Sequence, residues 1–411
     1  MQEAYRKLTR CRICGSKDLT KYLDLGTMPL ANSLLDEKDI DAKENMFPLE
    51  VLYCSNCSLS QLSIVVDPRI LFSNYVYRSS ISKTFQDHCK NMAEAVSEIF
   101  RGKNNLVVDI ASNDGCLLEQ FKDCGFKVLG IEPAENLARI ANSTGIETIG
   151  LFWNVDAAKK VLKKYGRAKV ITATNVLAHV DEVNDFLKGV HMLLDDDGLF
   201  IVEAPYLYDL LAKNEFDTIY HEHLSYFLVK PLIMLYEKNG LAINRIEKFP
   251  IHGGSLRIYA SKNKSNAHES VNEFLSLEKS ANLYGIDTYK SFDKKAKKVR
   301  EDLIKLLTEL KRQNKKVAAY GASAKGNTLL NYCNATKDMI KFIIEDTPEK
   351  QNKLAPGSRI PIKDASYLDR ENPDFIVLLA WNFAKEIMQK TEKYKQRGGR
   401  YIIPIPEVKI V

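Results

Sequence analysis

The sequence lacks any apolar run close to the about 18 residues that a membrane-spanning helix requires, so no span is predicted. Residues 1–11 have no apolar core behind their charges, so no secretory signal is predicted and a cytoplasmic location is expected. The basic excess is also small, because 59 Lys and Arg face 53 Asp and Glu, a net charge of +6 over 411 residues. This balance argues against a dedicated nucleic-acid binder and agrees with a small anionic ligand.

The densest basic stretch, residues 290–316, carries apolar residues at three- and four-residue spacing. This pattern predicts an amphipathic helix whose charged face is solvated, and an RNA- or membrane-binding role is the weaker alternative. The apolar positions are Val299, Leu303, Leu306, Leu307 and Leu310.

Four of the eight cysteines form two Cys-x-x-Cys pairs, Cys11 with Cys14 and Cys54 with Cys57. Two residues between thiolates let both sulfurs of a tight turn reach one tetrahedral Zn²⁺. Four thiolates fill all its positions, so the predicted zinc is structural and does no chemistry. The segment 15–53 is longer than a usual zinc-ribbon spacing and is expected to carry a small strand or loop structure of its own.

A thioredoxin-like redox pair is the alternative, but that motif has one Cys-x-x-Cys in a βαβ setting and not two. The other four cysteines have no such spacing and are expected to be buried apolar thiols. They are Cys89, Cys116, Cys124 and Cys333.

The middle of the chain predicts a doubly wound α/β sheet. The apolar run at 106–110 contains Asp109, leads into the small residues of the turn 111–115, and is followed by a helical pattern at 116–121. A second buried strand at 126–133 ends in Glu132. An acid at the end of the second strand is where such sheets bind the ribose hydroxyls of an adenosine.

The turn itself separates two cofactor classes. An NAD site requires Gly-x-Gly-x-x-Gly so that the backbone can approach a pyrophosphate, whereas this turn reads Ala-Ser-Asn-Asp-Gly. The acid at Asp114 repels a pyrophosphate but suits the positive charges of S-adenosylmethionine, which is therefore favoured over NAD. The predicted contacts are Asp109, Ser112, Asn113, Asp114, Gly115 and Glu132.

Two further strands, at 169–175 and 198–205, are predicted around a helix at 183–194. Ligands of such sheets bind beyond the carboxyl ends of the strands. Asn175, His179 and Glu203 follow or end these strands, so all three are expected to face the site, with Asn175 assigned to the cofactor.

Proton-handling side chains gather at 220–227, where Tyr220, His221, Glu222 and His223 are consecutive and the whole chain has only seven histidines. A zinc triad is not favoured, because only one acid accompanies the histidines. The alternative to a catalytic cluster is a purely structural one, an aromatic surface turn with hydrogen-bonded histidines.

With these segments in order, the chain resembles the bacterial sugar C-methyltransferases that act on nucleotide-linked ketosugars in deoxysugar pathways, of the tetronitrose and mycarose type. The resemblance covers nearly the whole chain. It rests on the two cysteine pairs and on the segments 28–32, 75–80, 109–115, 130–133, 175–180, 220–227, 252–257 and 320–327.

The resemblance implies three parts, all within the α/β class. They are a zinc-binding domain at 1–82, a class I S-adenosylmethionine methyltransferase domain of Rossmann-like fold at 83–285, and a Rossmann-like nucleotide-sugar-binding domain at 286–411. The residues agree with the last, since 315–321 reads as a strand running into a turn and helix, and 342–346 and 375–379 read as further strands. Lys325 at that helix start is a predicted phosphate contact.

The resemblance further implies methylation of C3 of a 4-ketosugar through an enolate, with His223 as the base. Glu222 is a candidate to orient the base or a sugar hydroxyl, and Tyr220, His179 and Tyr77 are candidates to hydrogen-bond the ketone oxygen. Tyr77 is chosen over Tyr75 as the family's active-site tyrosine. Its neighbours Ser79 and Ser80, together with Lys325, are the predicted substrate-binding residues.

Two other functions stay open at this level. One is a catalytically silent protein that binds a nucleotide-sugar, and the other is a nucleic-acid methyltransferase that uses its zinc domain for binding.

Overall fold

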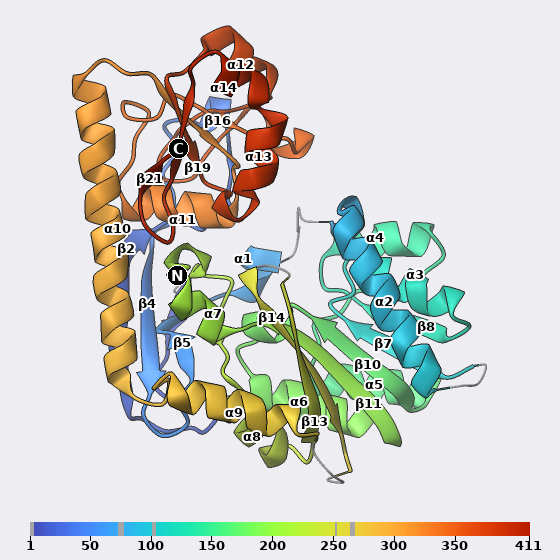
Figure 1. The fold of residues 1–411 in the computed structure, drawn as a ribbon. Coiled ribbons are helices and arrows are strands. Elements are labelled where there is room, and N and C mark those ends of the chain that lie inside the picture. The colour runs from blue at the N-terminus through green and yellow to red at the C-terminus, as the bar shows by residue number, and fades with distance from the viewer. Residues whose placement is uncertain (1–3, 73–77, 101–103, 251–252, 264–267) are drawn as a thin grey trace.

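Three larger β-sheets, each built mainly from a different part of the chain, organise the protein (Figure 1). The computed structural model describes residues 4–72, 78–100, 104–250, 253–263 and 268–411. In Figure 1 the carboxy-terminal sheet lies at the top, the central seven-stranded sheet lies at the lower right, and the long helix α10 (Ile286–Arg312) follows the left edge.

The amino-terminal sheet has the strand order β12-β5-β4-β2. Its long antiparallel pair, β2 (Leu19–Met28) and β4 (Phe47–Cys54), lies between the cysteine pairs, so strands form the structure predicted for that segment. The edge strand β12 (Ser225–Tyr226) comes from the middle of the chain and brings the proton-handling cluster against this sheet. The remaining elements are β1 (Tyr5–Lys7), β3 (Leu35–Asp36), β5 (Ser60–Leu62), β6 (Ile64–Val66) and α1 (Pro68–Phe72).

The central sheet has the order β13-β14-β11-β10-β7-β8-β9. The strands β11, β10, β7, β8 and β9 run parallel, and β14 is antiparallel to both of its neighbours. Its strands read as apolar runs because both faces are covered. Val107 packs with α2 and α3 on one face, whereas Val108 belongs to the core that includes α6 on the other. The strands are β7 (Leu106–Ile110), β8 (Lys127–Ile131), β9 (Thr148–Ile149), β10 (Ala168–Thr174), β11 (Leu194–Pro205), β13 (Ala242–Phe249) and β14 (Ser255–Ser261).

The helices of this part begin where the sequence supplies caps. The Ser82 hydroxyl accepts a hydrogen bond from the amide of Phe85 at the start of α2, and Asn154 caps α5 in the same way. The helices are α2 (Lys83–Ile99), α3 (Cys116–Asp123), α4 (Glu135–Ser143), α5 (Val155–Tyr165), α6 (Val183–Leu193), α7 (Leu207–Ala212) and α8 (Val229–Lys238).

The carboxy-terminal sheet has the order β18-β16-β15-β19-β20-β21 and is parallel except for β21. The predicted strand, turn and helix after residue 315 are confirmed as β15 and α11, with Ser323 as the helix cap. The elements are β15 (Val317–Tyr320), α11 (Ala324–Tyr332), β16 (Ile343–Ile344), β17 (Lys353–Leu354), β18 (Ile362–Lys363), α12 (Ser366–Glu371), β19 (Phe375–Leu378), α13 (Ala384–Lys390), α14 (Glu392–Gln396), β20 (Arg400–Ile403) and β21 (Lys409–Ile410).

Helices α9 (Ser270–Ser280) and α10 connect the central and carboxy-terminal sheets. The amphipathic helix predicted from the basic stretch is confirmed, because Val299, Leu303, Leu307 and Leu310 are buried along one face of α10. At its start, Tyr289 packs its ring against Tyr22 and Tyr53 of the amino-terminal sheet. The helix therefore joins all three parts of the chain.

Two further sequence expectations are settled by the fold. In the described part of the chain, no helix combines the length and the apolar character needed to span a bilayer. The prediction of four buried thiols outside the cysteine pairs is wrong for Cys124, which is exposed just beyond the end of α3. Helix ends are solvated on their outer side, and spacing along the sequence does not show which side a terminal residue takes.

Candidate functional site

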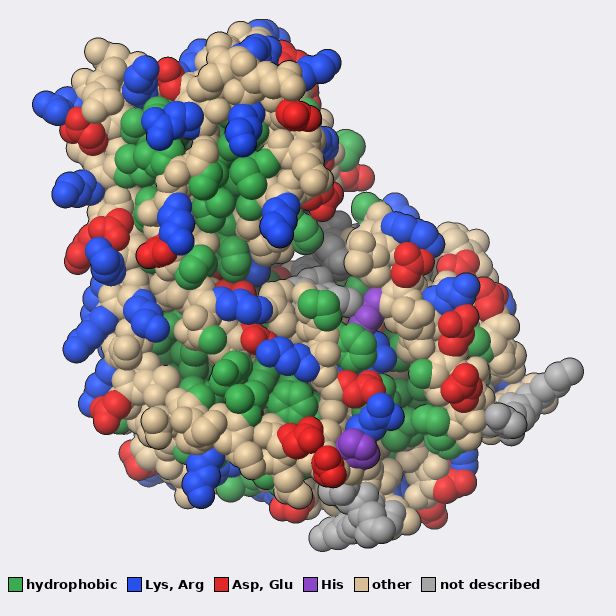
Figure 2. All heavy atoms as spheres, in the orientation of Figure 1, with side chains coloured by type: hydrophobic (Ala, Val, Ile, Leu, Met, Phe, Trp, Pro, Cys, Tyr) green, Lys and Arg blue, Asp and Glu red, His purple; other side chains and the backbone are tan. Residues whose placement is uncertain are grey.

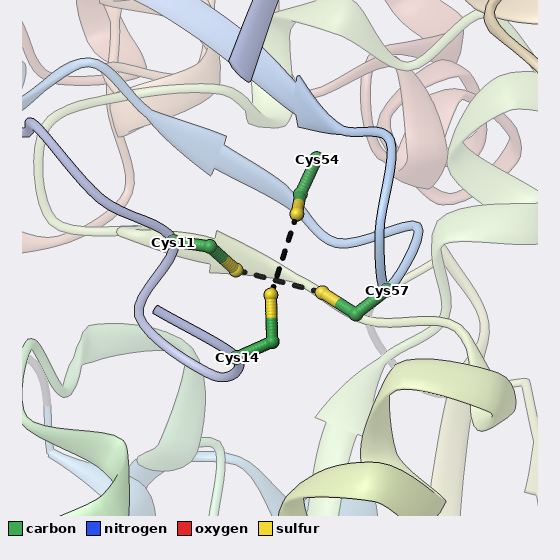
Figure 3. Close-up of side chains that lie close together, drawn as sticks. All are labelled: Cys11, Cys14, Cys54 and Cys57. Carbon is green, nitrogen blue, oxygen red and sulfur yellow. Dashed lines mark hydrogen bonds between the residues drawn. The ribbon is translucent and has the colours of Figure 1, made fainter. Parts of the chain in front are cut away.

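The four paired cysteines converge on one point (Figure 3). Their sulfurs all lie within 4.8 Å of one another, with Cys11 Sγ 3.5 Å from Cys57 Sγ and Cys14 Sγ 3.6 Å from Cys54 Sγ. Cys14 is partly exposed, and the other three are buried. Four thiols at this spacing match the tetrahedral all-sulfur donor set of a structural zinc site.

The two turns that carry these thiols are built alike. The amide of Gly15 donates to the carbonyl of Cys11 at 2.9 Å, and the amide of Ser58 donates to the carbonyl of Cys54 at 2.8 Å. Gly15 and Ser58 both have positive φ, at 77° and 67°, which lets each turn fold back on itself. The residues therefore fit Zn²⁺ in geometry as well as in number.

A second feature is a large cavity of about 2270 Å³ that all three parts of the chain line. Figure 2 shows the surface hollowed between the carboxy-terminal part and the central part, and acidic and basic side chains are interspersed over that face. A pocket for one drug-sized ligand measures about 300–1,000 Å³, so this cavity has room for a cofactor and a substrate together.

The turn after β7 forms one wall of this cavity. The Glu132 carboxylate at the end of β8 accepts hydrogen bonds from the amides of Asn113 and Ala134, each at 2.8 Å. Asp109 accepts one from the Thr172 hydroxyl at 2.6 Å. Both acids are buried and are held at the carboxyl ends of neighbouring parallel strands, where doubly wound sheets bind nucleosides.

Unsatisfied polar atoms on the same wall point to a ligand. Ser112 Oγ and Asn175 Oδ1 are buried without a hydrogen-bond partner among the described residues, and both residues line the cavity. Buried polar atoms are rarely left unpaired in a native structure, so a bound molecule is the natural partner. The residues predicted to hold S-adenosylmethionine thus fit a polar cofactor at this wall.

The Asp114 side chain points toward the segment 78–80 and not toward the cofactor wall, where its place in the turn suggested it would lie. Its carboxylate accepts from the Ser80 hydroxyl at 2.6 Å and lies 3.6 Å from Arg78 Nε. Neither Asp114 nor Gly115 is among the described residues that line the cavity. Asp114 therefore fixes the segment 78–80 against the turn, and Asp109 and Glu132 are the acids that face the cavity.

Burial shifts the pKa values of these two acids. It raises the pKa of the Asp109 carboxyl to about 7 and also raises the pKa of Glu132, because the ionised form of each loses hydration. A cation bound nearby would favour the ionised forms and lower both pKa values again.

The proton-handling cluster lies on another wall of the same cavity. His223 Nδ1 lies 2.9 Å from the carbonyl oxygen of Thr218, which can only accept, so Nδ1 carries the proton. His223 Nε2 then carries the lone pair and accepts from the Tyr220 hydroxyl at 2.9 Å. Both side chains line the cavity.

His179 lies beside this pair, with its ring centre 5.0 Å from that of His223. Its Nδ1 lies 2.7 Å from the carbonyl oxygen of Glu222 and therefore carries a proton too. Burial lowers the pKa of the His179 imidazole to about 4, so it is neutral at physiological pH. Its Nε2 has no proton to donate in that state.

The two residues between Tyr220 and His223 point away from the cavity. The Glu222 carboxylate accepts from the Asn32 amide at 2.6 Å, and His221 is buried beside the carbonyl of Pro48. Neither is among the described residues that line the cavity. Glu222 thus ties the cluster to the amino-terminal part.

Of the predicted substrate-binding residues, Ser79 and Lys325 line the cavity. Lys325 Nζ is buried without a hydrogen-bond partner in the described residues and lies 5.3 Å from the centre of the Trp381 ring. Ser80 is held by Asp114, as above. Tyr75 and Tyr77 lie outside the described residues.

Sequence reasoning placed Glu203 at the site, and this is wrong. Glu203 is buried away from the cavity, where it accepts from Arg257 Nε at 2.6 Å and lies 2.8 Å from His88 Nε2. The strand end was located correctly, but these two partners lie far away in the sequence and draw the carboxylate to the other side.

Sequence reasoning also missed Glu345, which lines the cavity from the end of β16. It accepts from the amides of Ala322 and Thr347, as Glu132 does from Asn113 and Ala134. The signal was available, since the strand predicted at 342–346 contains this acid after its apolar residues.

Three family descriptions match consecutive parts of the chain. They are "Putative zinc binding domain" over residues 11–72, "Methyltransferase domain" over residues 83–245, and "C-methyltransferase C-terminal domain" over residues 250–406.

The chain is also similar to curated and solved proteins. It is 37% identical to the C-methyltransferase NovU of Streptomyces niveus over 415 residues, which cover 100% of this chain and 99% of the relative. Two solved methyltransferases are similar to part of the chain. The magnesium protoporphyrin IX methyltransferase of Synechocystis PCC 6803 has 13% identity and a TM-score of 0.34, and the match covers 43% of this chain and 79% of that one. A methyltransferase of Archaeoglobus fulgidus has 14% identity and a TM-score of 0.35, and the match covers 43% of this chain and 93% of that one.

The central sheet, the Glu132 wall and the domain matches define an S-adenosylmethionine-dependent C-methyltransferase of class I fold, with a zinc-binding amino-terminal domain and a parallel carboxy-terminal sheet. Because the similarity to NovU extends over the whole chain, the protein belongs to the C-methyltransferase family, and the resemblance seen in its sequence is confirmed.

Proposed function

We propose that this enzyme methylates C3 of a nucleotide-linked 4-ketosugar, with His223 as the base that forms the enolate. The observation that carries the proposal is the Tyr220–His223 pair in the same cavity as the Glu132 wall. A carbon next to a ketone needs only a base to become a nucleophile, and an imidazole is suited to that task near neutral pH.

S-adenosylmethionine, when bound, supplies the methyl group. Asp109, Ser112, Asn113, Glu132 and Asn175 are the residues that line the cavity where we place it. The Glu132 carboxylate is already oriented by two amide donors, which keeps its remaining lone pairs directed to a ribose.

The hydrogen bonds of the cluster suggest how the proton moves. The C–H bond at C3 breaks, its proton goes to His223 Nε2, and its electron pair forms the enolate with the negative charge on the ketone oxygen. The Thr218 carbonyl stabilises the resulting imidazolium through Nδ1–H. Because Nε2 has one lone pair, the Tyr220 hydroxyl turns away from it before Nε2 takes the C3 proton, and the hydroxyl can then donate to the developing enolate oxygen.

We place the nucleotide diphosphate toward the carboxy-terminal part, against Lys325, with Ser79 of the segment 78–80 as a second contact. Lys325 supports this because its buried ammonium has no hydrogen-bond partner among the described residues and faces the cavity. We also propose that the domains span residues 1–82, 83–285 and 286–411. A cytoplasmic location is proposed as well, because it agrees with a sugar-nucleotide substrate. The silent-binder alternative finds no support, since the family is enzymatic.

The direct test is incubation with S-adenosylmethionine and a panel of nucleotide 4-ketosugars, with the product mass read for one added methylene. Position-specific deuterium at C3 identifies the carbon, because methylation there removes that label. If no ketosugar gains mass while another carbon acid does, the substrate class is overturned.

Replacement of Glu132 by Ala is expected to weaken S-adenosylmethionine binding by about 1–3 kcal/mol, because a charged acceptor for the ribose hydroxyls is lost. Titration calorimetry measures this directly. Glu135→Ala, an exposed acid at the start of α4, is the matched control and should bind as the wild type does. Equal affinity in both variants would move the ribose away from Glu132.

Cofactor affinity is also expected to rise with pH. Because the pKa of Asp109 is about 7, its carboxyl is mostly neutral at about pH 6 and mostly ionised at about pH 8, and only the ionised form attracts a cationic ligand. Affinity should therefore increase by up to about 10-fold over that interval. In Asp109→Asn this increase should disappear, and a wild-type pH profile in the variant would exclude Asp109 as its source.

A further inference from the structure

The segment 214–218, between α7 and Tyr220, is held from the carboxy-terminal part of the chain. All five of its residues are buried, and the three-residue 3₁₀ helix η4 (Phe216–Thr218) forms its second half. It is named the base-positioning segment here because its last carbonyl group, that of Thr218, accepts from His223 Nδ1 at 2.9 Å.

Three contacts attach this segment to three separate places beyond residue 330. The Asn214 amide donates to the carbonyl of Pro406 at 3.1 Å. The Phe216 ring lies edge-on to that of Tyr332, with ring centres 5.5 Å apart. The indole N–H of Trp381 donates to the Asp217 carboxylate at 2.7 Å.

The segment is also held by hydrogen bonds of its own backbone. The amides of Thr218 and Ile219 donate to the carbonyls of Glu215 and Phe216, each at 3.1 Å. A displacement of Asp217 therefore moves the Thr218 carbonyl with it. Since that carbonyl keeps the proton on Nδ1, its position also decides whether Nε2 is free of a proton.

We propose that Asp217 and Trp381 are positioning residues, through which the carboxy-terminal part of the chain holds His223 in its Nδ1-protonated form. This inference rests on the proposed role of His223 as the base. It gives the carboxy-terminal part a function in the chemistry as well as in substrate binding.

Of the three contacts, the Asp217–Trp381 hydrogen bond is the one that holds a carboxylate. Asp217 has no solvent exposure, and its second carboxylate oxygen has no hydrogen-bond partner among the described residues. Burial raises the pKa of Asp217, and the nearby Lys325 ammonium opposes that rise. Loss of the indole donor leaves a buried carboxylate without its one side-chain hydrogen bond in the described structure, so the segment is expected to shift.

Trp381→Phe in the full-length protein tests the proposal, since it keeps an aromatic ring beside Lys325 and removes only the N–H donor and part of the ring. The form of His223 is read by ¹⁵N NMR of histidine-labelled protein, with its signals identified by their absence from His223→Asn. Wild type should show a proton on Nδ1, and the variant should show a mixture of the two tautomers. Turnover should fall by about 10- to 100-fold while KM for the sugar is little changed.

Two further variants are matched controls. Trp153→Phe removes the other tryptophan N–H, which donates to the Phe186 carbonyl in the same cavity, and should leave the His223 tautomer as in wild type. Asp217→Asn keeps an oxygen that can accept from Trp381, and it should retain the Nδ1 proton that Asp217→Ala loses. This second pair carries the test if Trp381→Phe does not fold.

An unchanged tautomer in both Trp381→Phe and Asp217→Ala would overturn the proposal. A raised KM with unchanged turnover and tautomer would also overturn it, because Trp381 would then only contact the substrate. Failure of the proposed function has a separate indication: His223→Asn would keep wild-type turnover, while the NMR measurement would still show whether Asp217 and Trp381 fix the ring.

Discussion

His223→Asn is expected to lower methyl transfer by about 10²–10⁴-fold, the usual loss when a general base is removed. Asn keeps much of the shape and hydrogen-bonding capacity of the ring but cannot take up a proton near neutral pH. S-adenosylmethionine affinity should be unchanged, because His223 lies on a different wall of the cavity from Glu132.

Hydrogen exchange separates this role from a purely structural one. With wild-type enzyme the C3 hydrogen of the ketosugar should exchange with D₂O, and in His223→Asn this exchange should disappear together with turnover. His191→Asn, at the far end of α6, is the matched control and should behave as wild type. If His223→Asn exchanges that hydrogen at the wild-type rate, another residue is the base, and His179 is the next to test.

The structure makes His179 a weak base. Its burial stabilises the neutral ring and lowers its pKa to about 4, so its protonated form is a strong acid and its neutral form a poor proton acceptor. Sequence alone did not show this shift for His179, because burial depends on the elements that pack around its ring.

Much of the site could be predicted because its residues follow the ends of parallel strands. Asp109, Glu132 and Asn175 each stand beside an apolar run, and parallel strands place such residues at one edge of the sheet. The order of the motifs along the chain then identified the family. Local pattern and family order together gave the sheets, the zinc ligands and the cavity wall.

Side-chain direction could not be predicted where the partner lies far away in the sequence. Glu222 is adjacent to His223 but is drawn to Asn32 of the amino-terminal part. Asp217 precedes the cluster by a few residues, yet its partner is Trp381. A sequence pattern assigns a residue to an element, whereas these contacts depend on how three separate sheets pack.

The first zinc knuckle also makes contacts with residues far away in the sequence. Through these contacts the metal site stabilises parts of the chain outside the two cysteine turns. The carbonyl of Ile13 accepts from Lys238 Nζ at 2.8 Å, and that of Arg12 accepts from the Asn184 amide at 2.7 Å. The buried Arg12 guanidinium also forms an ion pair with the partly exposed Asp181, which lines the cavity. The first knuckle therefore packs directly on helices α6 and α8 of the central part.

Cys54→Ser should lose the bound zinc and destabilise the whole enzyme, with about one zinc per chain expected in the wild type by elemental analysis. Metal binding to such sites contributes about 10–16 kcal/mol in isolated zinc peptides, and removal of one thiolate forfeits most of it. Because the knuckle contacts α6 and α8, the midpoint of thermal unfolding should fall for the central part as well as for the amino-terminal part. Cys124→Ser, which changes an exposed thiol outside the cluster, is the matched control and should keep both the zinc and the midpoint. Full zinc occupancy in Cys54→Ser, or no zinc in carefully purified wild type, would contradict the four-cysteine site.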